Sequence, residues 1–216
     1  MKPQQVDSEK VNSVLKSINQ KLSHVKAEDQ VLVAFDVEAT GPRFDNEVNM
    51  VGVAFLFPDQ KEEFSFEICI KTKNPFDPVC YREFWSEHLD TLKYIEEHAR
   101  EPEEAWNTFL EIWEGFMAMH SKILIVGDCL HFDIPAIDRG LRTYTRRPCG
   151  IWYNIQKNNS IHNTVSIDSL TKQVPERVKE EIKKNKPQNH LANEDAAYML
   201  KRYVLLTNFF KENLNK

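Results

Sequence analysis

Alternating apolar and polar stretches along the chain predict a succession of strands and helices. Residues 31–35 read VLVAF, a continuous apolar run that is typical of a buried strand, and Gly41-Pro42 ends it as a turn. Residues 48–57 and 63–70 are predicted as two further strands joined by a Pro-Asp turn. Short strands are also expected in KILIVGD at 122–128 and in VSIDSL at 165–170.

Helical spacing of apolar residues predicts the remaining elements. Residues 8–26 read as an amphipathic helix, and an aromatic-rich stretch at 75–120 is divided into two helical halves by Pro102. A helix is expected to start near Phe132-Asp133, with Pro135 in its first turn. Two more are expected at 174–184 and 193–214. The pattern predicts an N-terminal helical extension at 1–29 and an α/β domain with a mixed sheet at 30–216.

Composition restricts the function classes. A chain of 216 residues suits one domain with a buried core, and no apolar stretch is long enough for a membrane span or a signal peptide. The four cysteines are scattered without a zinc-site spacing, which favours reduced thiols and an intracellular, cytoplasmic location. A net charge of -5 argues against coating nucleic acid by charge alone, although an enzyme that grips a few phosphates is compatible with it.

Two acids stand at the end of the first predicted strand. Asp36 and Glu38 are separated by one residue, so in a strand both side chains point to the same face. Like charges this close raise each other's pKa and cost stability unless a cation or a proton lies between them. Either a Lys or Arg pairs with one of them, or both hold a metal ion.

Further acids follow at two predicted helix starts. Asp133 comes just after a strand, where open α/β sheets collect ligands, and Asp195 follows His190 after four intervening residues. Each acid alone is better explained as favouring a helix N-terminus, and His190 alone as a solvated loop residue. The conjunction of all five residues is what indicates a site.

The order of these motifs resembles the DEDDh family of 3′–5′ exonucleases, which includes RNase T, oligoribonuclease and proofreading subunits of bacterial replicative polymerases. The match consists of FDVEATG at 35–41, FD at 132–133 and HLANED at 190–195, and it runs from about residue 30 to 212. Asp128 and Cys129 stand where the family often has His-Asn. The resemblance implies a ribonuclease-H-like fold, with a central five-stranded mixed sheet flanked by helices.

The resemblance also implies a role for each residue. Asp36, Glu38, Asp133 and Asp195 would hold two Mg²⁺ or Mn²⁺ ions, which suit hard oxygen ligands and can stabilise an in-line displacement at phosphorus. His190 would be the general base, since an imidazole is largely neutral at pH 7.

The same resemblance places the terminal 3′-hydroxyl of a nucleic acid near the backbone of Thr40 and Gly41. Two basic clusters could hold phosphates further back, although for each alone a solvated face is slightly favoured. Phe44, Tyr144, Trp152 and Tyr153 are candidates to stack bases, and Asp168 is better explained by a cap or a salt bridge. The basic clusters are Arg139, Arg142, Arg146 and Arg147, and Lys183, Lys184 and Lys186.

The leading hypothesis is therefore a divalent-metal-dependent 3′–5′ exonuclease that releases nucleoside 5′-monophosphates from single-stranded ends, with RNA favoured over DNA. The alternatives are a polymerase-associated DNA proofreading exonuclease, an endonuclease of the ribonuclease H type, and a catalytically inactive domain that binds nucleic acid or protein. The resemblance also allows a homodimer, since family members are often dimers. No membrane partner is expected.

Overall fold

A computed structural model of the chain describes residues 30–43, 45–57, 63–120, 122–145, 151 and 161–214. Several predictions lie outside these residues and are not taken further: the helix within 1–29, the Pro-Asp turn, and the roles of Phe44, Arg146, Arg147, Trp152 and Tyr153.

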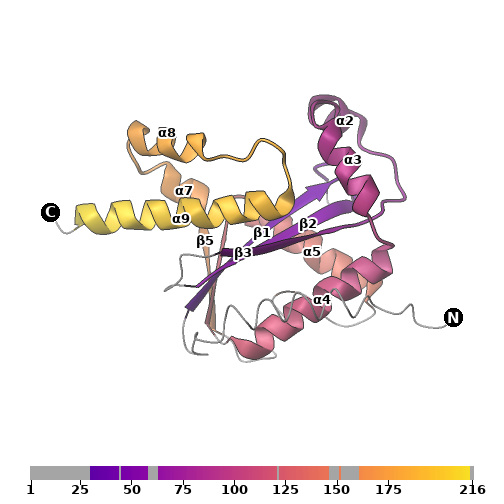
Figure 1. Ribbon diagram of the computed structural model, residues 1–216, viewed down its shortest axis with the longest axis horizontal. Coiled ribbons are helices and arrows are strands. Elements are labelled where there is room, and N and C mark those ends of the chain that lie inside the picture. Colours follow the sequence, from indigo (N-terminus) through magenta and orange to yellow (C-terminus); the bar gives the residue numbers. More distant parts are fainter. Residues whose placement is uncertain are drawn as a thin grey trace.

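Five strands form one mixed sheet in the order β3-β2-β1-β4-β5 (Figure 1). The first three strands are antiparallel neighbours, while β4 runs parallel to β1 and β5 runs parallel to β4. The predicted α/β class with a mixed, five-stranded sheet is confirmed. The strands are β1 (Gln30–Ala39), β2 (Val48–Leu56), β3 (Glu63–Cys69), β4 (Lys122–Gly127) and β5 (Ile161–Ser166).

The helices predicted at 174–184 and 193–214 are confirmed, whereas the part of 75–120 before Pro102 is divided into three pieces instead of forming one helix. Pro102 begins a new helix as expected, because a proline lacks the N–H that the first turn leaves unpaired. The helices after the hairpin are α2 (Pro78–Glu83), the 3₁₀ turn η1 (Trp85–Glu87), α3 (Leu89–His98), α4 (Pro102–Met119), α5 (Leu130–Tyr144), α7 (Ile167–Thr171), α8 (Glu176–Lys184) and α9 (Ala192–Leu214).

Two predicted boundaries were wrong. Helix α5 starts at Leu130, because the Cys129 carbonyl accepts the amides of Phe132 and Asp133, so Pro135 lies inside the helix rather than in its first turn. The segment VSIDSL is strand only as far as Ser166, and Ile167 begins α7. Short apolar runs do not distinguish a strand end from a helix start, which explains the second error.

Helices cover both faces of the sheet (Figure 1). The odd-numbered residues of β1, such as Val33 and Phe35, are fully buried against α4 and α5. The even-numbered Leu32 and Ala34 pack instead with α7, α8 and α9. With this period of two, successive residues of β1 face the two helical layers in turn.

A third apolar cluster closes one end of the sheet. It joins Trp85 and Ile95 of the α2–α3 segment to Met50 of β2 and Ala192 of α9. The Trp85 indole N–H donates to the Ala39 carbonyl at 3.0 Å, which ties this segment to the end of β1. Among the described residues, no helix has both the length and the apolar character that crossing a membrane requires.

Candidate metal-binding active site

The two acids of β1 continue the series of side chains that faces α9. Leu32 and Ala34 pack on that side, and Asp36 and Glu38 follow them at the same period of two. Both acids line one cavity together with α9 residues. The strand thus carries its carboxylates out of the core at the end where α9 begins.

Gly52 allows α9 to begin directly over these acids. It is the cross-strand partner of Asp36, and a Cβ at this position would lie 2.0 Å from the carbonyl carbon of Ala192. Only a glycine permits this approach of helix backbone to strand. A glycine inside the apolar run VNMVGVAFL was a signal of this contact that the sequence analysis did not use.

His190 lies two residues before the start of α9 and has a strained backbone. Its φ of 48° lies in the left-handed region, which is uncommon for a residue with a side chain. The preceding residue is held from outside, because the Thr91 hydroxyl donates to the Asn189 carbonyl. The imidazole contacts Phe84 and His88, with ring centroids 5.1 Å and 4.2 Å away. These contacts direct His190 toward the carboxylates, and its Nδ1 lies 3.7 Å from Asp195 Oδ2.

Three of the predicted residues already form a compact group of ligand atoms. One atom each from Glu38, His190 and Asp195 lies within 4.8 Å of the other two. Such a separation is compatible with one divalent cation between them, and Asp36 lines the same cavity.

Asp133 lies in the first turn of α5, in a different element from the other acids. Its side chain is 3 % exposed, and its Oδ2 atom has no hydrogen-bond partner in the described part of the chain. A buried carboxylate oxygen without a partner costs roughly 1–3 kcal/mol or more, so this atom is a strong candidate for a cation ligand. Asp133 does not line the cavity itself, but its charge raises the pKa of both Asp36 and Glu38.

Burial and the charges of neighbouring acids raise the pKa values of these carboxyl groups. Burial, and then the charges of the neighbouring acids, raise the pKa of Asp36 well above its ordinary value. Burial together with Asp195 and Asp133 raises the pKa of Glu38 to about 8. Burial raises the pKa of Asp133 to about 8, with a contribution from Asp128, and that of Asp195 to about 6. Without a cation, the site favours protons on several of its carboxyl groups.

The pKa of His190 is shifted in the opposite direction, downward. Burial lowers the pKa of its imidazole, and the nearby His88 and Lys186 lower it further. The ring is therefore neutral at pH 7 and has a lone pair with which to accept a proton.

Asp128 is an acid of this cavity that the prediction did not include. It pairs with Arg202 of α9 at 3.3 Å, and the same guanidinium reaches Asp168 at 2.9 Å. The expectation that Asp168 makes a salt bridge is confirmed. Arg202 comes from the middle of α9, and the sequence gives no local signal that brings it to the end of β4.

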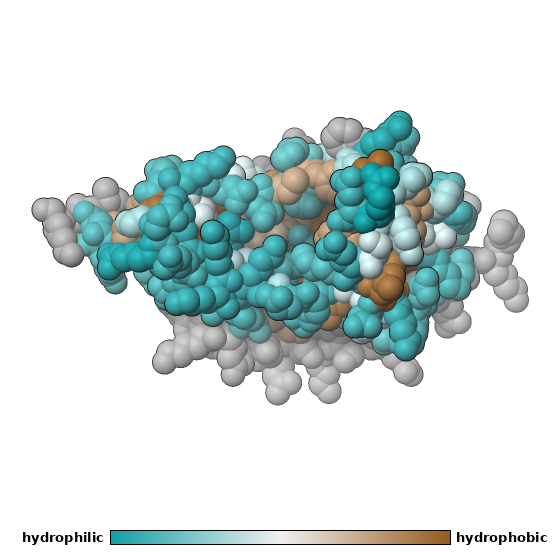
Figure 2. Space-filling model, turned by 90° about the horizontal axis from the view of Figure 1, so that it is seen from above, coloured by the Kyte–Doolittle hydropathy of each residue, from teal (hydrophilic) through white to brown (hydrophobic). Residues whose placement is uncertain are grey.

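The cavity in front of the carboxylates has a volume of about 520 Å³. From above, the surface is hollowed between the part over α8 and α9 and the part over α2 and α3 (Figure 2). The acids Asp36, Glu38, Asp128 and Asp195 line it, and so do basic side chains. The basic ones are Lys179, Lys183, Lys186 and Arg202.

The donor set fits a hard divalent cation. Within the compact group, Glu38 and Asp195 offer oxygen ligands and His190 offers a nitrogen, and Asp36 adds a carboxylate to the same cavity. Mg²⁺ and Mn²⁺ prefer such oxygen-rich sites. A bound cation would also remove the mutual repulsion that raises the carboxyl pKa values.

Four of the residues predicted to contact nucleic acid do not line the carboxylate cavity in the described part of the chain. The Thr40 amide donates to the Glu47 carbonyl, and the Thr40 hydroxyl accepts from the Glu47 amide, so Thr40 serves the turn that Gly41 continues. Arg139 donates to the Asn46 carbonyl and lines a separate cavity of about 210 Å³. Arg142 is exposed and does not line the carboxylate cavity. For these four residues, binding of nucleic acid stays a prediction.

Comparison with models of known protein families finds no match to this chain, and comparison with curated proteins finds none either.

Proposed function

We propose that this protein is a divalent-metal-dependent exonuclease that hydrolyses single-stranded nucleic acid from its 3′ end and releases nucleoside 5′-monophosphates. The observation that carries the proposal is that Asp36, Glu38 and Asp195 share one cavity with a neutral histidine and with basic side chains, while the buried Asp133 is close enough to raise the pKa of two of them. A five-stranded mixed sheet with helices on both faces also supports the ribonuclease-H-like fold that such nucleases share.

The four carboxylates would hold two Mg²⁺ or Mn²⁺ ions. When bound, such ions supply a water of lowered pKa and stabilise charge on the attacking and leaving oxygens. Burial matters for this function, because ionised carboxylates that are buried close together lower the stability of the protein until cations neutralise them. Asp133, with its unpartnered oxygen, would serve from the α5 side.

His190 would accept the proton of the attacking water. Its lowered pKa keeps the imidazole unprotonated at neutral pH, and its place 3.7 Å from Asp195 keeps it beside the cation ligands. The left-handed backbone and the Thr91 contact support this position, since strain of this kind persists where surrounding contacts hold it.

Specific observations weigh against the alternatives. A domain that only binds partners has no use for a buried, mutually repelling set of acids, and repulsion of this kind lowers stability. An endonuclease of the ribonuclease H type remains the second candidate, because the same carboxylates could serve internal cleavage. The cavity of about 520 Å³ favours a strand end over a long duplex.

Digestion of a single-stranded oligonucleotide labelled at its 5′ end tests the proposal. With Mn²⁺ present, we expect a ladder that shortens from the 3′ end, stronger with RNA than with DNA, and weaker when the 3′ end carries a phosphate. His190→Ala should lower the rate by about 10²–10⁴-fold, because it removes a general base.

The matched control is His98→Ala, because His98 is an exposed histidine of α3 that does not line the cavity. It should retain the wild-type rate. Internal cuts would support the endonuclease instead. Absence of cleavage with either cation would support a binding domain.

A further inference from the structure

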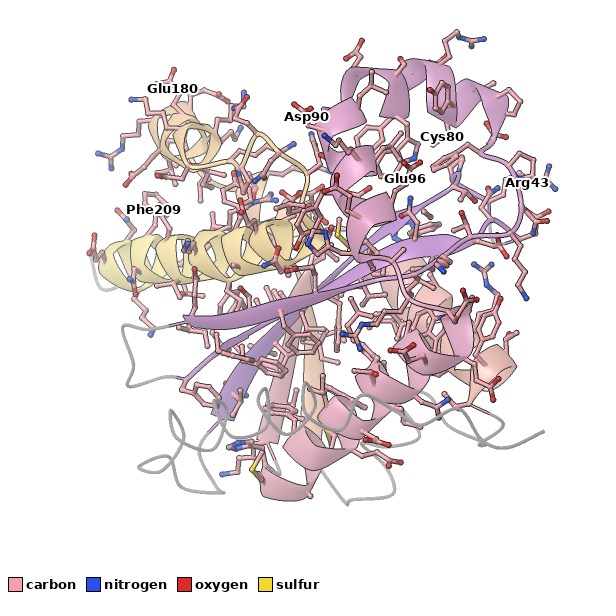
Figure 3. All side chains as sticks on the ribbon, turned by 45° about the vertical axis from the view of Figure 1, so that its right-hand side comes forward. Arg43, Cys80, Asp90, Glu96, Glu180 and Phe209 are labelled. Atoms are coloured by element: carbon pink, nitrogen blue, oxygen red, sulfur yellow. The ribbon has the colours of Figure 1, made fainter. Side chains whose placement is uncertain are left out.

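One flank of the carboxylate cavity is basic, and it belongs to α8 and the segment that follows it. Figure 3 shows α8, marked by Glu180, on the other side of the start of α9 from α3, marked by Asp90. Lys179, Lys183 and Lys186 line the cavity at intervals of four and three residues. Lys179 and Lys183 are therefore neighbours on one helix face, about 6 Å apart along the axis.

The packing of α8 fixes which face these lysines share. Val178 and Ile182, one residue before Lys179 and Lys183, are buried against α9. The Tyr198 hydroxyl donates to the Ile182 carbonyl at 2.8 Å, which ties the end of α8 to α9. Because these contacts set the rotation of the helix, the lysines are presented to the cavity by the fold.

The charges of this flank are only partly compensated. Lys179 pairs with Glu176, and Arg202 pairs with Asp128 and Asp168. Within the described residues, neither Lys183 nor Lys186 has an ion-pair partner within 4 Å. Lys186 nevertheless lies close enough to the catalytic group to lower the pKa of both Asp195 and His190.

We infer that Lys183 and Lys186 bind the phosphodiester backbone of the strand whose 3′ end lies at the carboxylates. This inference rests on the proposed function. An ammonium group beside a cavity, without an ion-pair partner among the described residues, attracts a polyanion, and phosphate contacts position a strand without reading its sequence. The lysines hold phosphates on the 5′ side of the bond that is cut, which explains how a chain of net charge -5 grips nucleic acid.

The same geometry favours these lysines over the described arginines of the other basic cluster. Arg139 donates to a backbone carbonyl and lines a different cavity, so its charge is directed away from the carboxylates. The lysines of α8 share the cavity of Asp36 and Asp195. Lys184 is exposed on the same helix but does not line that cavity, which makes it a matched control.

Binding of a 5′-fluorescein-labelled single-stranded oligonucleotide to the full chain, measured by anisotropy, tests the inference. The parent is His190→Ala with Mg²⁺ present, so that binding is read without rapid cleavage. Adding Lys183→Gln and Lys186→Gln should weaken binding by about tenfold or more at low salt. It should also reduce the slope of log K against log salt by about 0.7 for each lysine.

Lys184→Gln in the same background should bind within about twofold of the parent. Equal affinity of the double variant and the parent would overturn the inference, and so would an equal loss on Lys184→Gln. Titration with a nucleoside 5′-monophosphate distinguishes lysines that bind the strand from lysines that bind the released product. The double variant should bind the monophosphate like the parent, and a tenfold loss there would overturn the assignment to the strand.

The inference and the proposed function fail in different ways. If the lysine variants change binding but wild-type protein cleaves nothing, the exonuclease is wrong and the strand-binding site stands. If wild-type protein cleaves and Lys183→Gln with Lys186→Gln leaves KM unchanged, the strand-binding site is wrong and the exonuclease stands.

Discussion

Asp133 is the residue that connects burial to function most clearly. Its carboxyl is 3 % exposed with one oxygen unpartnered, and burial raises its pKa to about 8. A group whose folded pKa exceeds its unfolded value lowers stability above the unfolded pKa. The penalty is absent below about pH 4 and grows until the pH passes about 8.

We therefore predict that the metal-free protein becomes less stable as the pH rises from 5 to 8, since Glu38 and Asp195 shift in the same direction. Asp133→Asn should raise the free energy of unfolding of the metal-free protein at pH 8 by about 2 kcal/mol, and by less at pH 5. Thermal unfolding in a chelator measures both values. Mg²⁺ should stabilise the wild type more than the variant.

Asp90→Asn is the control, because Asp90 is an exposed acid in the first turn of α3. Its stability should follow the wild type within about 0.5 kcal/mol at both pH values. A stability of the metal-free wild type that rises steadily from pH 5 to 8 would contradict the electrostatic account.

At the scale of elements, the start of α9 is where the site is assembled. The helix brings Asp195 and the preceding His190 over β1, and Gly52 of β2 makes room for its backbone. The 3₁₀ turn and α3 hold the other side of the histidine through His88 and Thr91. The geometry of the site thus depends on contacts between elements that are far apart in the chain.

Gly52→Ala should displace the start of α9. The new Cβ would lie 2.0–2.3 Å from backbone atoms of Ala192 and Asn193, which cannot rotate away. We expect a loss of about 2–4 kcal/mol in unfolding free energy and a larger loss of Mn²⁺ affinity than the stability change alone explains. Thermal unfolding and calorimetric titration of Mn²⁺ measure the two effects.

Gly127→Ala is the matched control in this case. The three atoms nearest to a Cβ there all belong to the side chain of Leu130, and that side chain can move. Its Mn²⁺ affinity should stay near that of the wild type. A Gly52→Ala variant with wild-type stability and Mn²⁺ affinity would show that the close approach is not needed.

The sequence predicted these elements well where periodicity is strong. The alternation in β1 and the spacing of α9 place Asp36, Glu38 and Asp195 on one face, and the structure has them line one cavity. Asp128, Lys179 and Arg202 were missed, because their neighbours are set by packing between distant elements and leave no local pattern. Pro135 was misplaced, since the start of α5 depends on amide bonds to the Cys129 carbonyl.

For the whole molecule, two helical layers bury the sheet and leave its charged chemistry at one end. The odd and even residues of β1 pack into separate apolar cores, and Asp36 and Glu38 follow where the strand reaches the start of α9. The cavity there is lined both by acids and by lysines of α8 and of the segment that follows it. Bound cations would neutralise the acids, and the phosphates of a bound strand would neutralise the lysines.

The most direct test of the account is calorimetric titration of the metal-free protein with Mn²⁺ at pH 7, in buffers of different ionisation enthalpy. We predict saturable binding that releases protons, because Glu38 and Asp133 with pKa values near 8 are largely protonated before a cation binds. Asp36→Asn should abolish or greatly weaken the binding, while Asp90→Asn should not. Absence of Mn²⁺ binding to the wild type, or binding that Asp36→Asn leaves unchanged, would contradict the claim that these carboxylates form a metal site.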